Sequence, residues 1–197
     1  MKLTVDDIAD QRAYERERKE FRARIIDLKK IRRIGIGPFV TMVFENRDTI
    51  RFQIQEMARA EKILTDEAIQ TELDVYNPLI PERCSLAATL FIELTSKDEL
   101  VEWLPKLVGI ERSAELRIGQ RDAEEVVRAR PDAEHERQLT RETITASVHY
   151  VHYELTPEQV ERFAWEPVRL AIAHPNYTYT TELSETSKQS LVVDLRG

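Results

Sequence analysis

The sequence predicts an α+β fold in which a helical N-terminal lobe packs on a mainly antiparallel sheet. Helical and strand-like patterns interleave irregularly along the 197 residues, whereas parallel α/β folds alternate them regularly. Several strand-like runs are joined by connections too short for a crossover helix. The first part of the chain is mostly helical in pattern. We therefore predict a helix-rich lobe over residues 1–82 and a sheet-rich lobe over residues 83–197, folding as one cooperative unit.

A long charged helix is expected to begin the chain. Thr4 and Asp7 have the spacing of a helix N-cap with an acid three positions later, and the helix is expected to run to about Lys30. Its apolar residues recur at spacings of seven, four and three, which places on one face Tyr14, Phe21, Ile25 and Leu28. Because this apolar face is narrow, the helix could lie across a larger body or pair with another chain.

The rest of the predicted lobe contains two strands and two helices. Strands are expected over 34–37 and 39–45, with a turn at Gly37-Pro38 between them. Helices are expected over 49–64 and 65–76. The second must end there, because the proline of Asn77-Pro78 forces the preceding residue out of the helical region.

The second half of the chain alternates strands with three short helices. The predicted strands cover residues 86–94, 114–118, 125–129, 143–155 and 168–173. The predicted helices cover residues 96–107, 156–165 and 184–195. The charged stretch from Arg130 to Arg141 contains Pro131 and is expected to be a surface loop.

Composition excludes several classes of protein. With 42% apolar and 33% charged residues, the chain is neither a membrane protein nor wholly disordered. The single cysteine, Cys84, excludes an internal disulfide and a four-cysteine zinc site, and we expect it to be a structural thiol. The N-terminus lacks the basic-then-apolar pattern of a signal peptide, so we expect a cytoplasmic protein.

Basic residues form a stripe on the first predicted helix. Between Arg12 and Arg33 ten basic residues face four acidic ones, a local charge of +6 in a chain of net charge -7. Spacings of four, seven and four place on one helical face Arg18, Arg22, Lys29 and Arg33. Nucleic acid is a poor candidate ligand, because the whole chain is acidic and no aromatic residues are interleaved. The alternatives left are a solvated face and a docking surface for an acidic protein partner.

Two glutamates on apolar helix faces raise the question of a metal site. Glu61 and Glu72 are expected among apolar neighbours, where an unpaired carboxylate is costly. They could form salt bridges with Arg47, Arg59 or the basic first helix. Alternatively, iron, manganese or zinc could bind a set of two carboxylates and two imidazoles formed by Glu61, Glu72, His149 and His174. No Glu-x-x-His or His-Glu-x-x-His motif supports such a site.

Two runs carry a resemblance to a known family. They are Gln-Ile-Gln-Glu-Met at 53–57 and Tyr-Asn-Pro-Leu-Ile-Pro at 76–81, supported by Phe-Glu-Asn-Arg at 44–47 and His174-Pro175. Over nearly its whole length the chain resembles an uncharacterised bacterial family, the domain of unknown function numbered 3501. Members are often encoded near rubrerythrin-like di-iron proteins and iron-sulfur oxidoreductases. The resemblance therefore implies an accessory role in redox or peroxide defence, without a catalytic mechanism.

Three functions remain open at this point. The first is an accessory protein that binds a redox partner, and the sequence favours it over an enzyme. The second is a metal-dependent enzyme whose Glu/His site lies between the two lobes. The third is a structural homodimer paired through the N-terminal helix.

Overall fold

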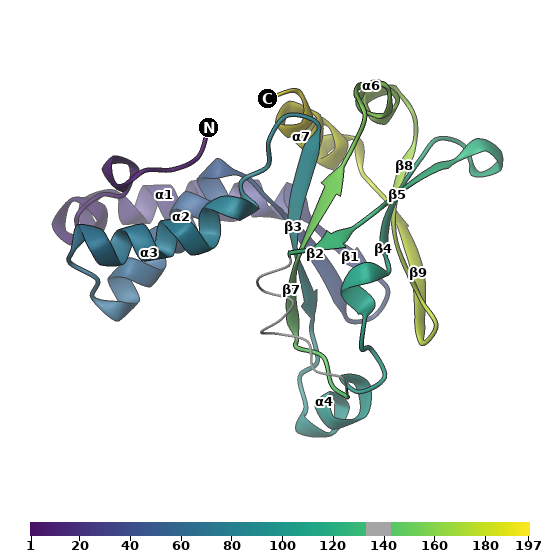
Figure 1. Ribbon diagram of the computed structural model, residues 1–197, viewed down its shortest axis with the longest axis horizontal. Helices are drawn as coiled ribbons and strands as arrows, with labels where there is room; N and C mark the ends of the chain where they lie inside the picture. Colours follow the sequence, from purple (N-terminus) through teal and green to yellow (C-terminus); the bar gives the residue numbers. More distant parts are fainter. Residues whose placement is uncertain (133–142) are drawn as a thin grey trace.

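The structure is a computed structural model that describes residues 1–132 and 143–197 (Figure 1). Its helices are α1 (Gln11–Arg32), α2 (Arg47–Glu61), α3 (Asp66–Tyr76), α4 (Lys97–Trp103), α6 (Pro157–Trp165) and α7 (Glu185–Arg196). Its strands are β1 (Arg33–Ile36), β2 (Val40–Glu45), β3 (Ser85–Ile92), β4 (Ala114–Ile118), β5 (Glu125–Arg128), β6 (Arg130–Pro131), β7 (Val148–Glu154), β8 (Val168–His174) and β9 (Tyr177–Glu182). The predicted α+β class is confirmed.

The strands form two antiparallel sheets that face each other. The first sheet has the order β1-β2-β3-β7-β6 and the second β5-β4-β8-β9. On one side β5 leads through Ala129 directly into β6, so one stretch of chain serves both sheets. On the other side β9 contacts β1, where the Tyr177 hydroxyl donates to the Ile36 carbonyl at 2.6 Å. The two sheets together therefore resemble a flattened barrel, and we call this part the barrel.

Strand alternation fills the barrel with apolar side chains. Met42 on β2 lies opposite Leu90 on β3, and Leu116 on β4 lies opposite Leu170 on β8. All four side chains are buried in one continuous core between the sheets. Since successive strand residues point to opposite faces, the alternate residues of β2 and β3 face outward, toward the helices.

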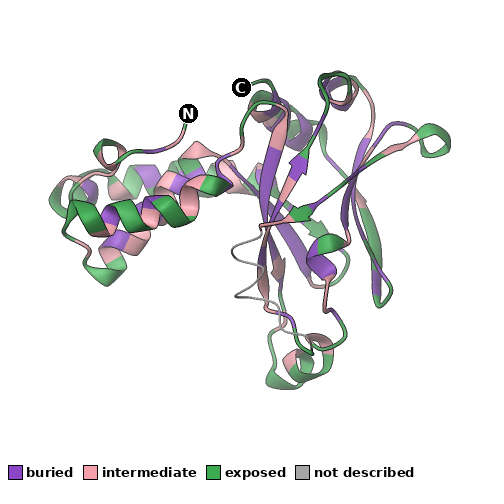
Figure 2. Cartoon of the chain, viewed as in Figure 1, coloured by how far each residue is buried: buried purple, intermediate pink, exposed green. Residues whose placement is uncertain are grey.

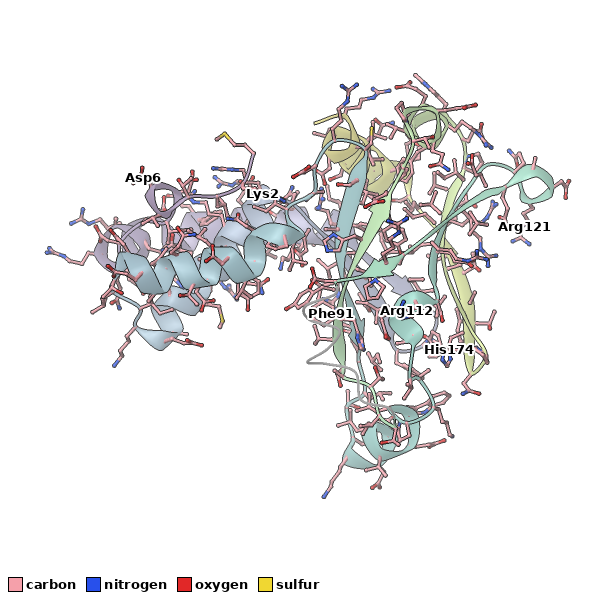
Figure 3. The ribbon with its side chains drawn as sticks, in the orientation of Figure 1. Lys2, Asp6, Phe91, Arg112, Arg121 and His174 are labelled. Carbon is pink, nitrogen blue, oxygen red and sulfur yellow. The ribbon has the colours of Figure 1, made fainter. Side chains whose placement is uncertain are left out.

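Helices α1, α2 and α3 lie side by side and extend away from the barrel (Figure 1). We call this part the helical lobe. Its apolar side chains form two small clusters separate from the barrel core, one around Ile54 and Leu73 and one around Phe21. The N-terminal segment (residues 1–10), on which Figure 3 labels Lys2 and Asp6, packs along these helices.

Most predicted elements lie within a few residues of the observed ones, with two differences near the start. The Thr4–Asp7 capping box closes a single 3-10 turn, and α1 begins only at Gln11, where the Asp10 carboxylate accepts from the backbone N–H groups of Arg12 and Ala13. Strands β1 and β2 belong to the predicted lobe 1–82 but pair with the sheet of the second lobe. The sheet thus continues across the predicted boundary.

The second half of the chain differs from prediction in its strands. The run from Tyr177 to Glu182 forms β9, for which no strand was predicted. Strand β7 begins at Val148, later than the predicted residue 143. Of the loop predicted over 130–141, Arg130 and Pro131 form β6, while residues 133–142 lie outside the described residues.

Candidate functional site

A groove with basic residues at its rim runs along α1 in the helical lobe. Its volume is about 270 Å³. Its lining comes from α1, the first residue of β1 and one residue of α2, and comprises Arg22, Ile25, Ile26, Lys29, Lys30, Arg33 and Phe52. We call it the α1 groove. Three of the four residues of the predicted basic stripe line it, because at 100° per residue the stripe flanks the buried face of α1.

The floor of the α1 groove is apolar and firmly packed. Phe52 contacts Phe21 edge to face, with ring centroids 5.6 Å apart and an interplanar angle of 88°. Ile25 is buried, whereas Ile26 is 41% exposed. The groove therefore offers aliphatic and aromatic surface that an apolar side chain of another molecule could cover.

The cations at the rim differ in how they are paired. Arg22 and Lys29 form no ion pair within the described part of the chain. Lys30 pairs with Asp27 at 2.7 Å, and Arg33 pairs with Glu93, in both cases between exposed side chains. Exposed pairs contribute little to stability, so a carboxylate from another molecule can replace these acids at small cost.

Arg18, the remaining residue of the predicted stripe, lies outside the groove and joins α1 to α2. Its Nε and Nη2 donate to the two carboxylate oxygens of Glu56 at 2.7 and 2.8 Å, and the Tyr14 hydroxyl donates to the same carboxylate at 2.6 Å. Partial burial alone would raise the pKa of the Glu56 carboxyl group. The hydrogen bonds have the larger effect and lower this pKa to about 2. In this structure Arg18 is engaged within the helical lobe.

The two glutamates predicted as metal ligands both lie in the helical lobe. Glu61 is the last residue of α2 and is exposed, so its expected apolar surroundings are wrong. Glu72 is half-buried on α3; burial raises the pKa of its carboxyl group, and the charge of Glu61 raises it further. Within the described part of the chain the alternative salt bridges to Arg47, Arg59 or the basic first helix do not form either; Arg47 pairs with Asp7 and Arg59 with Glu15.

The two histidines of the predicted site lie in the barrel. His149 is buried on β7, where its Nε2 is 2.9 Å from both the Thr145 hydroxyl and the Ala146 carbonyl oxygen. His174 ends β8, with its Nε2 3.2 Å from the Val108 carbonyl oxygen. Figure 3 shows His174 on the side of the barrel away from the helical lobe. The structure therefore does not bring the four predicted ligands together.

Candidate metal ligands do not cluster in the described part of the chain. Over residues 1–132 and 143–197, no group of three or more His, Cys, Asp or Glu side chains could hold a metal ion.

Cys84 is half-buried and has a left-handed backbone, with φ of 62°. In the same ranges every helix is too short or too polar to cross a bilayer.

Neither of two structural arginine–carboxylate pairs was predicted from the sequence. Glu56 was part of a recognised run but was not assigned as the partner of Arg18. Arg32, only 1% exposed, bonds the carbonyls of Phe44 and Glu45 and the Asp194 carboxylate of α7. The local sequence around Arg32, with the apolar residues Ile31 and Ile34 on either side, does not reveal a partner 162 residues away.

Comparisons with known proteins agree with the resemblance. A family model described as "Protein of unknown function (DUF3501)" matches residues 2–195. A crystal structure of a novel protein of unknown function from Burkholderia pseudomallei K96243 is 36% identical in sequence. The alignment covers 99% of this chain and 100% of that one, with a TM-score of 0.89. No curated protein matches the chain.

Proposed function

The chain belongs to the DUF3501 family of proteins of unknown function, and we propose that it is a binding protein that docks an acidic segment of a partner protein in the α1 groove. The observation that carries this proposal is the groove itself. It combines an apolar floor with two cations, Arg22 and Lys29, that no described acid neutralises.

The groove defines the chemistry of its ligand. Apolar side chains would cover Ile26 and Phe52, gaining about 25 cal/mol for each Å² of apolar surface removed from water. Aspartate or glutamate on either side would face Arg22 and Lys29. Attraction between opposite charges mainly speeds association and selects the orientation, while the apolar contacts supply most of the affinity. A short amphipathic acidic segment meets both requirements.

The biological setting of the proposal comes from the family resemblance. It favours a cytoplasmic accessory role in redox or peroxide defence, with the acidic segment belonging to a rubrerythrin-like or iron-sulfur oxidoreductase partner. A metal-dependent enzyme lacks a supporting site in the described residues. A homodimer paired through α1 would use the same surface. The experiment below therefore includes a measurement of self-association.

Charge reversal in the groove tests the proposal. The double variant Arg22→Glu/Lys29→Glu should lose partner proteins that copurify from the native host, because both free cations become repulsive. Arg12→Glu/Arg16→Glu is the matched control, since it makes the same charge change at exposed positions of α1 outside the groove. The control variant should retain the partner proteins. Raised salt should release these partners from the unmodified protein. Mass spectrometry should identify them as proteins that contain an acidic amphipathic segment.

Three results would contradict the proposal. The first is equal retention of every partner by both double variants. The second is a self-association of the unmodified protein, seen by sedimentation, that only the groove variant abolishes. The third is tight, salt-sensitive binding of random duplex DNA that depends on Arg22 and Lys29.

A further inference from the structure

The helical lobe encloses a cavity that is separate from the α1 groove. It has a volume of about 140 Å³ and shares no lining residue with the groove. Its apolar lining comes from the N-terminal segment, from α1 to α3 and from the turn before α3, and comprises Val5, Ile8, Ala9, Tyr14, Ala58, Ile63, Leu64 and Ile69. We infer that this cavity binds a small apolar molecule, of the size of one aromatic ring or of a chain of five to six carbons.

The N-terminal segment is fixed in place as one wall of the cavity. The Gln55 side chain both accepts from the Ala9 N–H at 3.0 Å and donates to the Ala9 carbonyl at 2.7 Å. The Asn77 side chain holds Leu3 in the same manner, at 2.9 Å for each bond. Because two amide side chains hydrogen-bond this segment near both of its ends, the cavity has a defined shape before any ligand enters.

Among the described residues, most polar side chains that line the cavity have partners, whereas the exposed Gln11 and Asp66 do not. Both ends of the Gln55 amide are bound to Ala9, and the Tyr14 hydroxyl donates to Glu56 at 2.6 Å. Arg59 donates to Glu15 at 2.5 Å, and the Thr65 hydroxyl accepts from the Ala68 N–H. Water in the cavity would therefore find hydrogen-bonding groups mainly on the exposed side chains of Gln11 and Asp66. Apolar cavities of about this size stay dry and take up apolar molecules such as benzene.

The turn between α2 and α3 provides an entrance. Ile63 and Leu64 line the cavity from this turn, yet the Leu64 side chain is 75% exposed. An apolar side chain at the mouth of an apolar cavity can move over a bound molecule and lose its own contact with water. The entrance and the cavity together favour an uncharged apolar ligand, since a charged one would lose its hydration against the apolar walls.

Benzene is a suitable probe of the full-length protein. We expect saturable shifts of the amide NMR signals of Ile8, Ala58 and Ile69, and a rise in Tm that grows with benzene concentration. Ala58→Leu should fill the cavity and weaken benzene binding by about tenfold or more. Ala60→Leu is the control, because Ala60 is exposed on the same helix and its variant should bind benzene normally.

A second cavity-filling variant, Ile69→Phe, can be used if Ala58→Leu fails to fold. Ile69→Phe adds volume to the opposite wall and should weaken benzene binding as well. Absence of saturable binding to the unmodified protein would overturn the inference. Benzene binding that both filled variants retain would overturn it too, because the molecule would then bind elsewhere. The docking proposal for the α1 groove would stand in either case.

Discussion

The barrel and the helical lobe of this chain are held together in different ways. The barrel has one continuous apolar core, to which both sheets and the buried faces of α6 and α7 contribute. Figure 2 shows its strands largely buried, whereas the helices of the lobe alternate buried and exposed positions. The lobe has two small apolar clusters and a cavity, and ion pairs such as Arg18–Glu56 join its helices.

This difference supports the proposal that the helical lobe, and not the barrel, binds the partner. Binding regions are drawn from the less tightly packed parts of proteins, because they must present apolar and charged groups that the fold itself does not use. The helical lobe has such groups in the α1 groove and in the cavity. The barrel supplies a rigid base, fixed to α1 through the buried side chain of Arg32.

The junction between the two regions should be the most sensitive point. Arg32→Met removes the cation from the largely buried Asp194 and leaves two backbone carbonyls without their donor. We expect a loss of about 3–5 kcal/mol in the free energy of unfolding, measured with urea at neutral pH. Arg33→Met, which removes the exposed pair with Glu93 and a cation–π contact with Phe91, should cost less than about 2 kcal/mol. Equal losses in the two variants would show that Arg32 is not the anchor.

Matched leucine truncations compare the packing of the two regions. Leu170 in the barrel and Leu73 in the lobe are both 0% exposed. Leu170→Ala should cost about 4–5 kcal/mol and Leu73→Ala about 2–3 kcal/mol, because the more loosely packed lobe can collapse around the lost side chain. Urea unfolding of both variants measures the difference. A larger loss for Leu73→Ala would contradict the looser packing of the lobe.

The smallest expected effect depends on pH and belongs to the lobe. The pKa of Glu56 lies at about 2, below the ordinary value of 4.5, so its carboxylate stabilises the folded state above pH 4.5. This contribution is lost as the pH falls from 4.5 toward 2. Glu56→Gln should therefore be less stable than the unmodified protein by about 1–2 kcal/mol at neutral pH. The difference in stability between the two proteins, followed by thermal unfolding, should disappear on acidification. A difference that does not depend on pH would mean that the charge of Glu56 is not its cause.

Local features of the fold could be predicted well from sequence. Helix α3 begins after Thr65, close to its predicted start, and it ends before the Asn77-Pro78 pair as expected. Strand β9 was missed, although Tyr177 to Thr181 alternates aromatic and β-branched residues in a pattern typical of strands. Only Tyr177 in that run is buried, so the apolar alternation was too weak to stand out.

Contacts between residues far apart in the sequence could not be predicted, and the basic stripe of α1 is an example. The helical period placed Arg22, Lys29 and Arg33 on one face, and the structure confirms that they line one groove. The same period could not show that Arg18 would meet Glu56 on a different helix. It also placed Glu61 among apolar residues, because a helical projection assumes that the helix continues. In fact α2 ends at Glu61, and Lys62 turns left-handed with φ of 56°.

Site-specific photo-crosslinking tests most directly the claim that the helical lobe, and not the barrel, binds the partner. A benzophenone amino acid would replace Ile26 in the α1 groove or, as the control, Trp165, which is 81% exposed on α6 beside the barrel. Irradiation in extracts of the native host should crosslink position 26, and not position 165, to a protein segment of apolar residues flanked by Asp or Glu. Crosslinks from position 165 alone, or from position 26 only to a second copy of this chain, would contradict the account.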